Sequence, residues 1–219
     1  MKQQILEKAT KKRILIIIAA MVFHLCSYYI PKLFNVGKTF ISLATELDNL
    51  IPFVPVFIVF YVLAFVQWGL NYLLLLAEED GFLYKYINAE IIGKAVCIFF
   101  FIMIPTTIQR PEVTGTGIFS WMTRTIYFFD TPVNLFPSMH CFQSWLCMRA
   151  AVETDMLPRR VKIYSILFTL GVVISTVCVK QHVFIDTVTG ITLAELSLLF
   201  VSEVSDLKKK IREAAEKIR

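Results

Sequence analysis

The chain has 219 residues, of which 57% are hydrophobic and 18% are charged. Soluble domains are typically roughly 45 to 50% apolar, so this composition excludes an ordinary soluble protein and predicts an integral membrane protein. The formal net charge of +5 fits attraction to anionic lipid headgroups and requires no nucleic-acid partner.

Apolar segments long enough to cross a bilayer recur six times, which predicts one all-α domain over residues 1–219, a six-transmembrane-helix bundle. The first segment lacks a small-x-small cleavage site, so we expect a retained anchor rather than a cleaved signal. The fourth contains Gln143, Ser144 and Arg149 and is expected to turn its polar face into the bundle. The predicted spans are residues 14–30, 51–76, 91–108, 137–152, 161–179 and 182–201, followed by a basic helical tail over 206–219.

Basic residues cluster before the first span, between the fourth and fifth, and after the sixth. With six spans these clusters share one side of the membrane, which the positive-inside rule assigns to the cytoplasm. We therefore expect a protein of the cell membrane with both termini in the cytoplasm. The connection over residues 77–90 is an exception because it is acidic. Lys94, near the inner end of the third span, is expected to reach the cytoplasmic interface.

Two histidines stand beside membrane-spanning segments, in Asn134-Leu-Phe-Pro-Ser-Met-His140 and in Lys180-Gln-His-Val-Phe-Ile-Asp186. The six-span topology brings both to the outer face, together with the connection over residues 109–136. Ionisable residues at a membrane are functional-site hypotheses by default. His24, within the first span, is instead expected to make a hydrogen bond between helices.

His182 and Asp186 are four residues apart, which places them on one face of a helix. A carboxylate there fixes the imidazole tautomer and leaves the other ring nitrogen free to attack, so His182 is the expected nucleophile. A capping or ion-pair role is the alternative for this pair alone. His140 lies at a helix start beside Ser138, where backbone N–H groups favour anions, and is the expected general acid.

Phosphoryl transfer needs cations and donors around the phosphate oxygens. Arg110, Ser138 and Lys180 are the expected phosphate-binding residues, and Asp130, Asn134 and Gln181 are further candidates. Arg110 also suits an interfacial anchor, and Asp130 a solvated loop charge. Without matching Cys residues or clustered carboxylates, the two histidines predict neither a metal site nor a cofactor.

Phe136-Pro-Ser-Met-His140 and His182-x-x-x-Asp186 resemble the second and third signature motifs of the type 2 phosphatidic acid phosphatase superfamily. The resemblance extends from about Arg110 to the sixth span. It implies six helices, an outward-facing site and a phosphohistidine mechanism. In that mechanism His182 attacks phosphorus, Asp186 supports it, and His140 protonates the leaving group.

The sequence departs from the family pattern at two cations. Met103 stands where the first motif has Lys, and Ser175-Thr176 where the third has Ser-Arg. Lys180 is expected to replace one of them. The pattern of Asp130, Asn134 and the Pro-Ser-x-His motif also resembles the branch of inositol phosphorylceramide synthases, which transfer a headgroup to a lipid alcohol.

We therefore expect a phosphatase acting on a lipid phosphate or diphosphate at the outer leaflet. Transfer of a phospho-headgroup to a lipid alcohol, as in sphingolipid synthesis, is the first alternative. The second is a non-enzymatic lipid-binding or transport protein with the same architecture. The lipid bilayer and a lipid phosphate are the expected partners, and the sequence leaves the individual lipid open.

Overall fold

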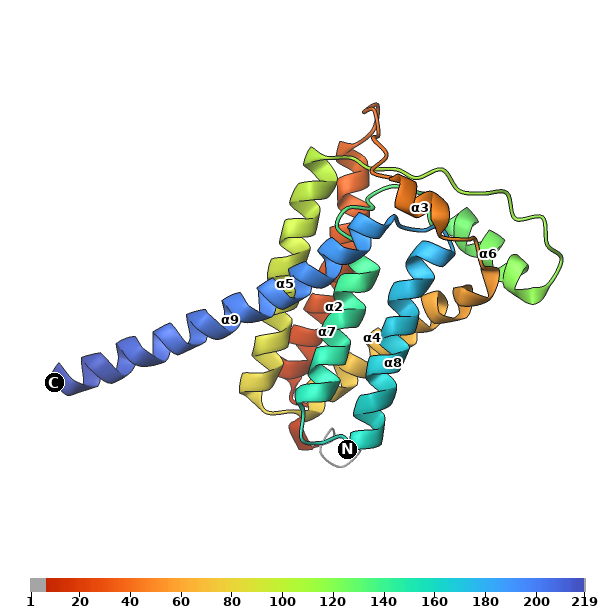
Figure 1. Cartoon of the computed structure of the whole chain (residues 1–219). Helices are drawn as coiled ribbons and strands as arrows, with labels where there is room; N and C mark the ends of the chain where they lie inside the picture. The colour runs from red at the N-terminus through yellow and green to blue at the C-terminus, as the bar shows by residue number, and fades with distance from the viewer. Residues whose placement is uncertain (1–6, 219) are drawn as a thin grey trace.

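The computed structural model describes residues 7–218, and its regular elements there are helices, so the all-α prediction is confirmed. Isolated β-bridges join Ile41 to Thr106 and Thr107 to Val133 in the loops. In chain order (Figure 1) the helices are α2 (Lys11–Phe34), α3 (Glu46–Leu50), the 3₁₀ turn η1 (Pro55–Phe57), α4 (Ile58–Ala77), α5 (Asp80–Met103), α6 (Ile118–Phe129), α7 (Met139–Glu153), α8 (Arg159–Cys178) and α9 (Phe184–Ile218).

Five of the described helices are long and apolar enough to cross a membrane: α2, α4 with η1, α5, α8 and α9. The expected fourth span is also helical, as α7, but has only 15 residues. At about 1.5 Å per residue it is about 22 Å long, shorter than the roughly 30 Å hydrocarbon core. The structure thus confirms an integral membrane protein with five candidate spans, and a sixth stays a prediction.

α7 lies at the centre of the bundle and packs against α4, α5, α8 and α9. Of the three polar residues expected to face the bundle, Gln143 and Ser144 are buried, and Ser144 accepts a hydrogen bond from Trp68 Nε1 at 2.9 Å, whereas Arg149 is exposed and lies 3.5 Å from Glu195. A Cβ atom at Gly93 of α5 would lie 2.2 Å from the Phe142 ring, so glycine permits this close packing. Since surrounding helices cover α7, it can carry polar groups without exposing them to lipid.

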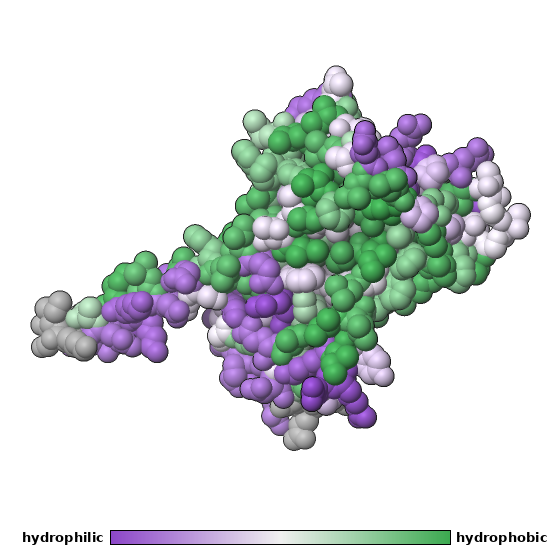
Figure 2. Space-filling model, in the orientation of Figure 1, coloured by the Kyte–Doolittle hydropathy of each residue, from purple (hydrophilic) through white to green (hydrophobic). Residues whose placement is uncertain are grey.

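α9 is continuous to Ile218, so the basic tail extends the last span as one helix, as predicted. Its final turns project beyond the bundle (Figure 1). Figure 2 shows hydrophobic residues over much of the bundle surface and hydrophilic residues gathered at its lower end, at its upper right and along the projecting part of α9.

The predicted start of the third span was wrong. α5 begins at Asp80, so most of the expected connection over residues 77–90 is helical. Arg13 pairs with Asp80 and donates to the carbonyl oxygen of Leu75 at 3.1 Å, so it caps the last turn of α4. The acidic connection is therefore neutralised by the basic start of α2, which explains why acidic residues occur at this end.

Lys94 also departs from expectation. Its side chain does not reach the interface but is fully buried in the bundle, paired with Glu90 one turn earlier on α5. The carboxylate partner explains how the ammonium group is accommodated there.

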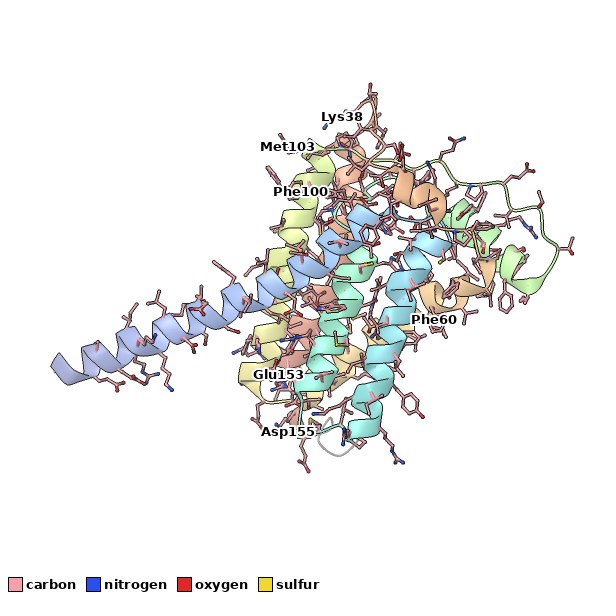
Figure 3. The ribbon with its side chains drawn as sticks, in the orientation of Figure 1. Lys38, Phe60, Phe100, Met103, Glu153 and Asp155 are labelled. Carbon is pink, nitrogen blue, oxygen red and sulfur yellow. The ribbon has the colours of Figure 1, made fainter. Side chains whose placement is uncertain are left out.

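The two ends of the bundle differ in the residues they carry: one has the basic helix starts and the other has the histidine motifs. The start of α2, the end of α7 and the α4–α5 turn meet at one, where Lys85 of α5 pairs with Glu153 at 2.6 Å. The start of α7, the end of α8 and the start of α9 meet at the other. Figure 3 shows Met103 at that second end and Glu153 with Asp155 at the first. Both histidine motifs lie at the second end, away from the basic residues in the first turns of α2 and α8.

Candidate active site

The start of α7 is fixed by contacts with α9. Ser138 is the N-cap: its Oγ accepts a hydrogen bond from Cys141 N at 3.3 Å, and its backbone N donates to Asp186 O at 2.9 Å. A Cβ atom at Gly190 would lie 2.4 Å from Ser138 O, so this glycine allows α9 to approach α7. These contacts place His140 in the first turn of α7.

The turn between α8 and α9 carries the second motif. Thr176 O accepts hydrogen bonds from the backbone N of both Gln181 and His182 at 3.0 Å. Lys180, directly before Gln181, adopts a left-handed backbone conformation, with φ 51°, which is uncommon for a residue other than glycine. The turn therefore holds His182 just before α9 begins, as expected from the sequence.

Both histidines line one cavity of about 230 Å³, which the described residues form between α2, α4, α6 and the two motifs. Asp130, Asn134 and Gln181 line it as well, so five of the nine sequence-predicted site residues meet there. The other lining residues are His24, Leu25, Tyr28, Tyr29, Tyr61, Phe65, Trp68, Ile126, Phe129, Val133, Leu135 and Met139.

Asp186 lies behind His182 as predicted. Its Oδ2 is 3.5 Å from His182 Nδ1 and also accepts a hydrogen bond from Val183 N at 3.1 Å. Since His182 precedes the first residue of α9, the pairing spans a turn and the helix start rather than two helical positions. With Nδ1 facing the carboxylate, Nε2 is the nitrogen available for reaction.

His140 sits among aromatic rings. It stacks on Tyr61, with ring centroids 3.9 Å apart and an interplanar angle of 12°, and meets Trp68 edge-on at 4.8 Å. Its Nε2 is buried and has no hydrogen-bond partner in residues 7–218. A buried polar atom without a partner at a cavity favours a ligand that supplies one.

Arg110, a predicted phosphate-binding residue, does not line the cavity but contacts Asp130 and Gln181, which do. One guanidinium nitrogen donates to the Asp130 carbonyl at 2.6 Å, and another donates to the Gln181 side chain. The guanidinium also lies 4.5 Å from the Tyr127 ring. Burial raises the pKa of Tyr127 to about 12, so its hydroxyl stays protonated and donates to Val179 O at 2.7 Å.

Asp130 is not a solvated loop charge. Its carboxylate accepts hydrogen bonds from the hydroxyls of Tyr28 and Tyr61, the latter at 3.3 Å. Asn134 has φ 59° and donates to Tyr28 O at 2.9 Å. Both residues thus join the loop before α7 to α2 while still facing the cavity.

Lys180 and Ser138 do not reach the cavity, contrary to their predicted phosphate role. Lys180 Nζ donates to the carbonyl oxygens of Asp48 in α3 at 2.8 Å and of Ile51, which follows α3, at 2.6 Å, so its donors are used at the end of that helix. Ser138 is fully buried as a helix cap. In the structure these two side chains hold the two motifs in place and contact no cavity surface.

The two positions that depart from the family pattern are also outside the cavity. Met103 ends α5 and is 63% exposed (Figure 3). Thr176 is buried and donates from Oγ1 to Val173 O at 2.7 Å. Among the described residues, no three His, Cys, Asp or Glu side chains are grouped so that they could hold a metal ion.

Sequence reasoning missed the aromatic wall of the cavity and the place of His24. Tyr61, Phe65 and Trp68 follow one face of α4 at helical spacing, a signal that was present but equally typical of ordinary packing. His24 makes the expected contact between helices, with Lys94 Nζ 2.5 Å from its Nδ1, but it also lines the cavity.

Comparison with known proteins adds no family to this picture. No family model, curated protein or solved structure matches the chain. The residues around the cavity and the two histidine motifs are therefore what a functional assignment depends on.

Proposed function

We propose that the protein is a membrane phosphatase that acts on a lipid phosphate or diphosphate through a phosphohistidine at His182. One observation carries the proposal: His140 and His182 come from separate elements to line one cavity, and Asp186 lies 3.5 Å behind His182. These residues can serve as a nucleophile, a carboxylate close enough to stabilise its charge, and an acid at the same cavity. The two signature-like motifs lend it further support.

The reaction has two steps. In the first, His182 Nε2 bonds to phosphorus while the bond from phosphorus to the leaving oxygen breaks, and His140 gives that oxygen its proton. In the second, water attacks phosphorus, the nitrogen–phosphorus bond breaks, and His140 takes the proton of the water. Asp186 stabilises the positive charge that the His182 ring carries between the steps.

Arg110 is the proposed cation for the phosphate. It is held beside His182 through Gln181, which lines the cavity, and the guanidinium nitrogen that contacts Gln181 can donate a charge-assisted hydrogen bond to a phosphate oxygen. Binding exchanges the Gln181 oxygen for a phosphate oxygen, while the Asp130 carbonyl keeps the guanidinium in place.

A lipid substrate is favoured by the mouth of the cavity. Several of its lining residues are large, apolar and open to the outside: Leu25 is 58% exposed, Phe65 51% and Phe129 75%. Leu25 and Phe65 belong to the candidate spans α2 and α4. A lipid phosphate placed in the cavity can therefore leave its chains in the hydrocarbon.

We place the cavity on the outer side of a cell membrane, with α7 as the sixth, covered span. The basic residues in the first turns of α2 and α8 lie at the bundle end away from the cavity, and such residues mark the cytoplasmic side. A cysteine introduced at Thr131, beside the cavity, should react with an impermeant reagent in intact cells. Absence of labelling there, with labelling after permeabilisation, contradicts this orientation.

Release of phosphate tests the chemistry. Purified protein in detergent is incubated with phosphatidic acid, phosphatidylglycerol phosphate, polyprenyl diphosphate and sphingoid phosphate. His182→Ala and His140→Ala should lose release from the preferred lipid, whereas Arg212→Ala, on the exposed tail, should not. A phosphoenzyme that is labile to acid and stable to base should form in wild type and not in His182→Ala. Undiminished release from His182→Ala contradicts the proposal.

The second candidate is headgroup transfer to a lipid alcohol. The exposed apolar mouth favours it, since a lipid alcohol can enter from the bilayer by the same route. Absence of phosphate release, together with headgroup exchange in the presence of diacylglycerol or ceramide, would make transfer the function. If both reactions are absent and His182→Ala leaves the cellular function unchanged, a non-enzymatic lipid-binding role follows.

A further inference from the structure

A network of buried polar side chains extends from the cavity into the bundle. His24 of α2 lines the cavity, and its Nδ1 lies 2.5 Å from Lys94 Nζ. Lys94 pairs with Glu90, which accepts a further hydrogen bond from Tyr72 OH at 2.5 Å. Lys94 is 0% and Glu90 2% exposed, so two opposite charges are enclosed in α5. Charges inside a membrane span are costly and are functional candidates by default.

The contact with Lys94 determines the tautomer and the charge of His24. A lysine ammonium has three donors and no acceptor, so the Nδ1 that contacts it must accept. The imidazole proton is therefore on Nε2. A second proton on the ring would place a positive charge beside Lys94, which is unfavourable in an enclosed site. His24 is thus held as a neutral ring whose Nε2 is a hydrogen-bond donor.

The location of His24 gives that donor a target. His24 is one helical turn, about 6 Å along α2, from Tyr28, which contacts Asp130 at the loop end of the cavity. It therefore lines the same cavity as His140 and His182, one turn of α2 away from the Asp130 contact. The buried Nε2 atoms of His140 and Gln181 have no hydrogen-bond partner within the described chain, which indicates a ligand rich in oxygen.

We propose that His24 is a third histidine of the site, a neutral donor that binds an oxygen of the lipid phosphate through Nε2. Lys94, Glu90 and Tyr72 are its positioning residues: Lys94 fixes the tautomer, Glu90 balances the charge of Lys94, and Tyr72 holds Glu90. The identity of the ligand rests on the proposed function. The alternative is a purely structural role, in which the hydrogen bond between His24 and Lys94 only joins α2 to α5.

Imidazole ¹⁵N NMR of the full chain in detergent separates these readings. Wild type should show His24 with Nε2 protonated and Nδ1 accepting, and the Nε2 signal should shift when a short-chain phosphatidic acid is added. A shift with inorganic phosphate as well assigns the contact to the phosphate group, whereas a shift with the lipid alone assigns it to an ester oxygen. A signal that neither probe shifts, or a ring protonated on Nδ1, overturns the proposal.

Variants test the same contact by kinetics. His24→Phe should raise KM for the lipid phosphate by about 10- to 100-fold, the loss expected for a hydrogen bond to a charged group, and His24→Gln should restore part of it because its amide can donate. Cys26→Ala, on α2 outside the cavity, is the matched control. A folded His24→Phe protein with wild-type KM contradicts the donor role.

Replacing both charges tests the positioning residues without leaving one charge unpaired. Glu90→Met with Lys94→Met removes the ion pair as a unit, a change that buried pairs often tolerate. The His24 signal should then become a mixture of tautomers, and KM should rise while the melting temperature changes little. If the His24 tautomer and KM are unchanged, Lys94 and Glu90 contribute only to helix packing. If wild type releases no phosphate but the Nε2 shift persists, the proposed function fails and this inference stands.

Discussion

Replacing Asp186 with asparagine separates electrostatic support of the nucleophile from shape. The side chains are nearly isosteric, and an asparagine oxygen still accepts the hydrogen bond from Val183 N, so the turn should keep its form. Asp186 Oδ2 lies 3.5 Å from His182 Nδ1. At an effective dielectric constant of about 20, opposite charges at this separation interact by about 5 kcal/mol. Since each 1.36 kcal/mol is tenfold in rate, kcat should fall by roughly three orders of magnitude.

The assay is the initial rate of phosphate release from the preferred lipid in detergent. KM should change little, because the charge that Asp186 stabilises appears on His182 only as the bond to phosphorus forms. Asp206→Asn, the same change on the exposed tail, is the matched control, and thermal unfolding checks that Asp186→Asn is folded. Activity within tenfold of wild type, while His182→Ala is inactive, would refute the orienting role.

Three further substitutions follow from the same structure. Arg110→Lys should lower phosphate release by about tenfold or more, because an ammonium cannot replace the fork that reaches Gln181 and the Asp130 carbonyl; wild-type release contradicts this. Lys180→Met should reduce stability by about 1 to 3 kcal/mol with unchanged KM, as seen by thermal unfolding and kinetics; a raised KM at unchanged stability would return Lys180 to the phosphate. Gly190→Ala should destabilise by about 1 to 3 kcal/mol or more, since its Cβ would lie 2.4 Å from Ser138 O; an unchanged melting temperature rules out that clash.

The sequence was sufficient for features that depend on local composition. Hydropathy located the apolar helices, because a segment that crosses hydrocarbon must be nearly free of charge. It also drew attention to His140 and His182, since ionisable residues beside such segments need a reason. Their common cavity followed from the order of helices, which brings the start of α7 and the α8–α9 turn to one end of the bundle.

Side-chain direction was beyond reach of the sequence. Lys180 precedes the proposed nucleophile by two residues, yet its ammonium group binds the carbonyl oxygens of Asp48 and Ile51 at the end of α3. Lys94 looked like an interfacial residue because Glu90 lay outside the apolar window, although one helical turn joins them. In both cases the position depends on a partner whose proximity exists only in the fold.

Water and a lipid alcohol attack the phosphohistidine in the same way, because in both cases His140 must take a proton from the attacking oxygen. In the proposed mechanism His140 protonates a leaving oxygen in the first step and deprotonates an attacking oxygen in the second, and microscopic reversibility makes these one act in opposite directions. The choice of acceptor therefore depends on what occupies the mouth of the cavity after the first product leaves. Leu25, Phe65 and Phe129 line the cavity and are exposed, and Leu25 and Phe65 belong to candidate spans, where a lipid alcohol can compete with water for access. Polar substitutions at these positions should consequently shift the ratio of hydrolysis to transfer without changing formation of the phosphohistidine.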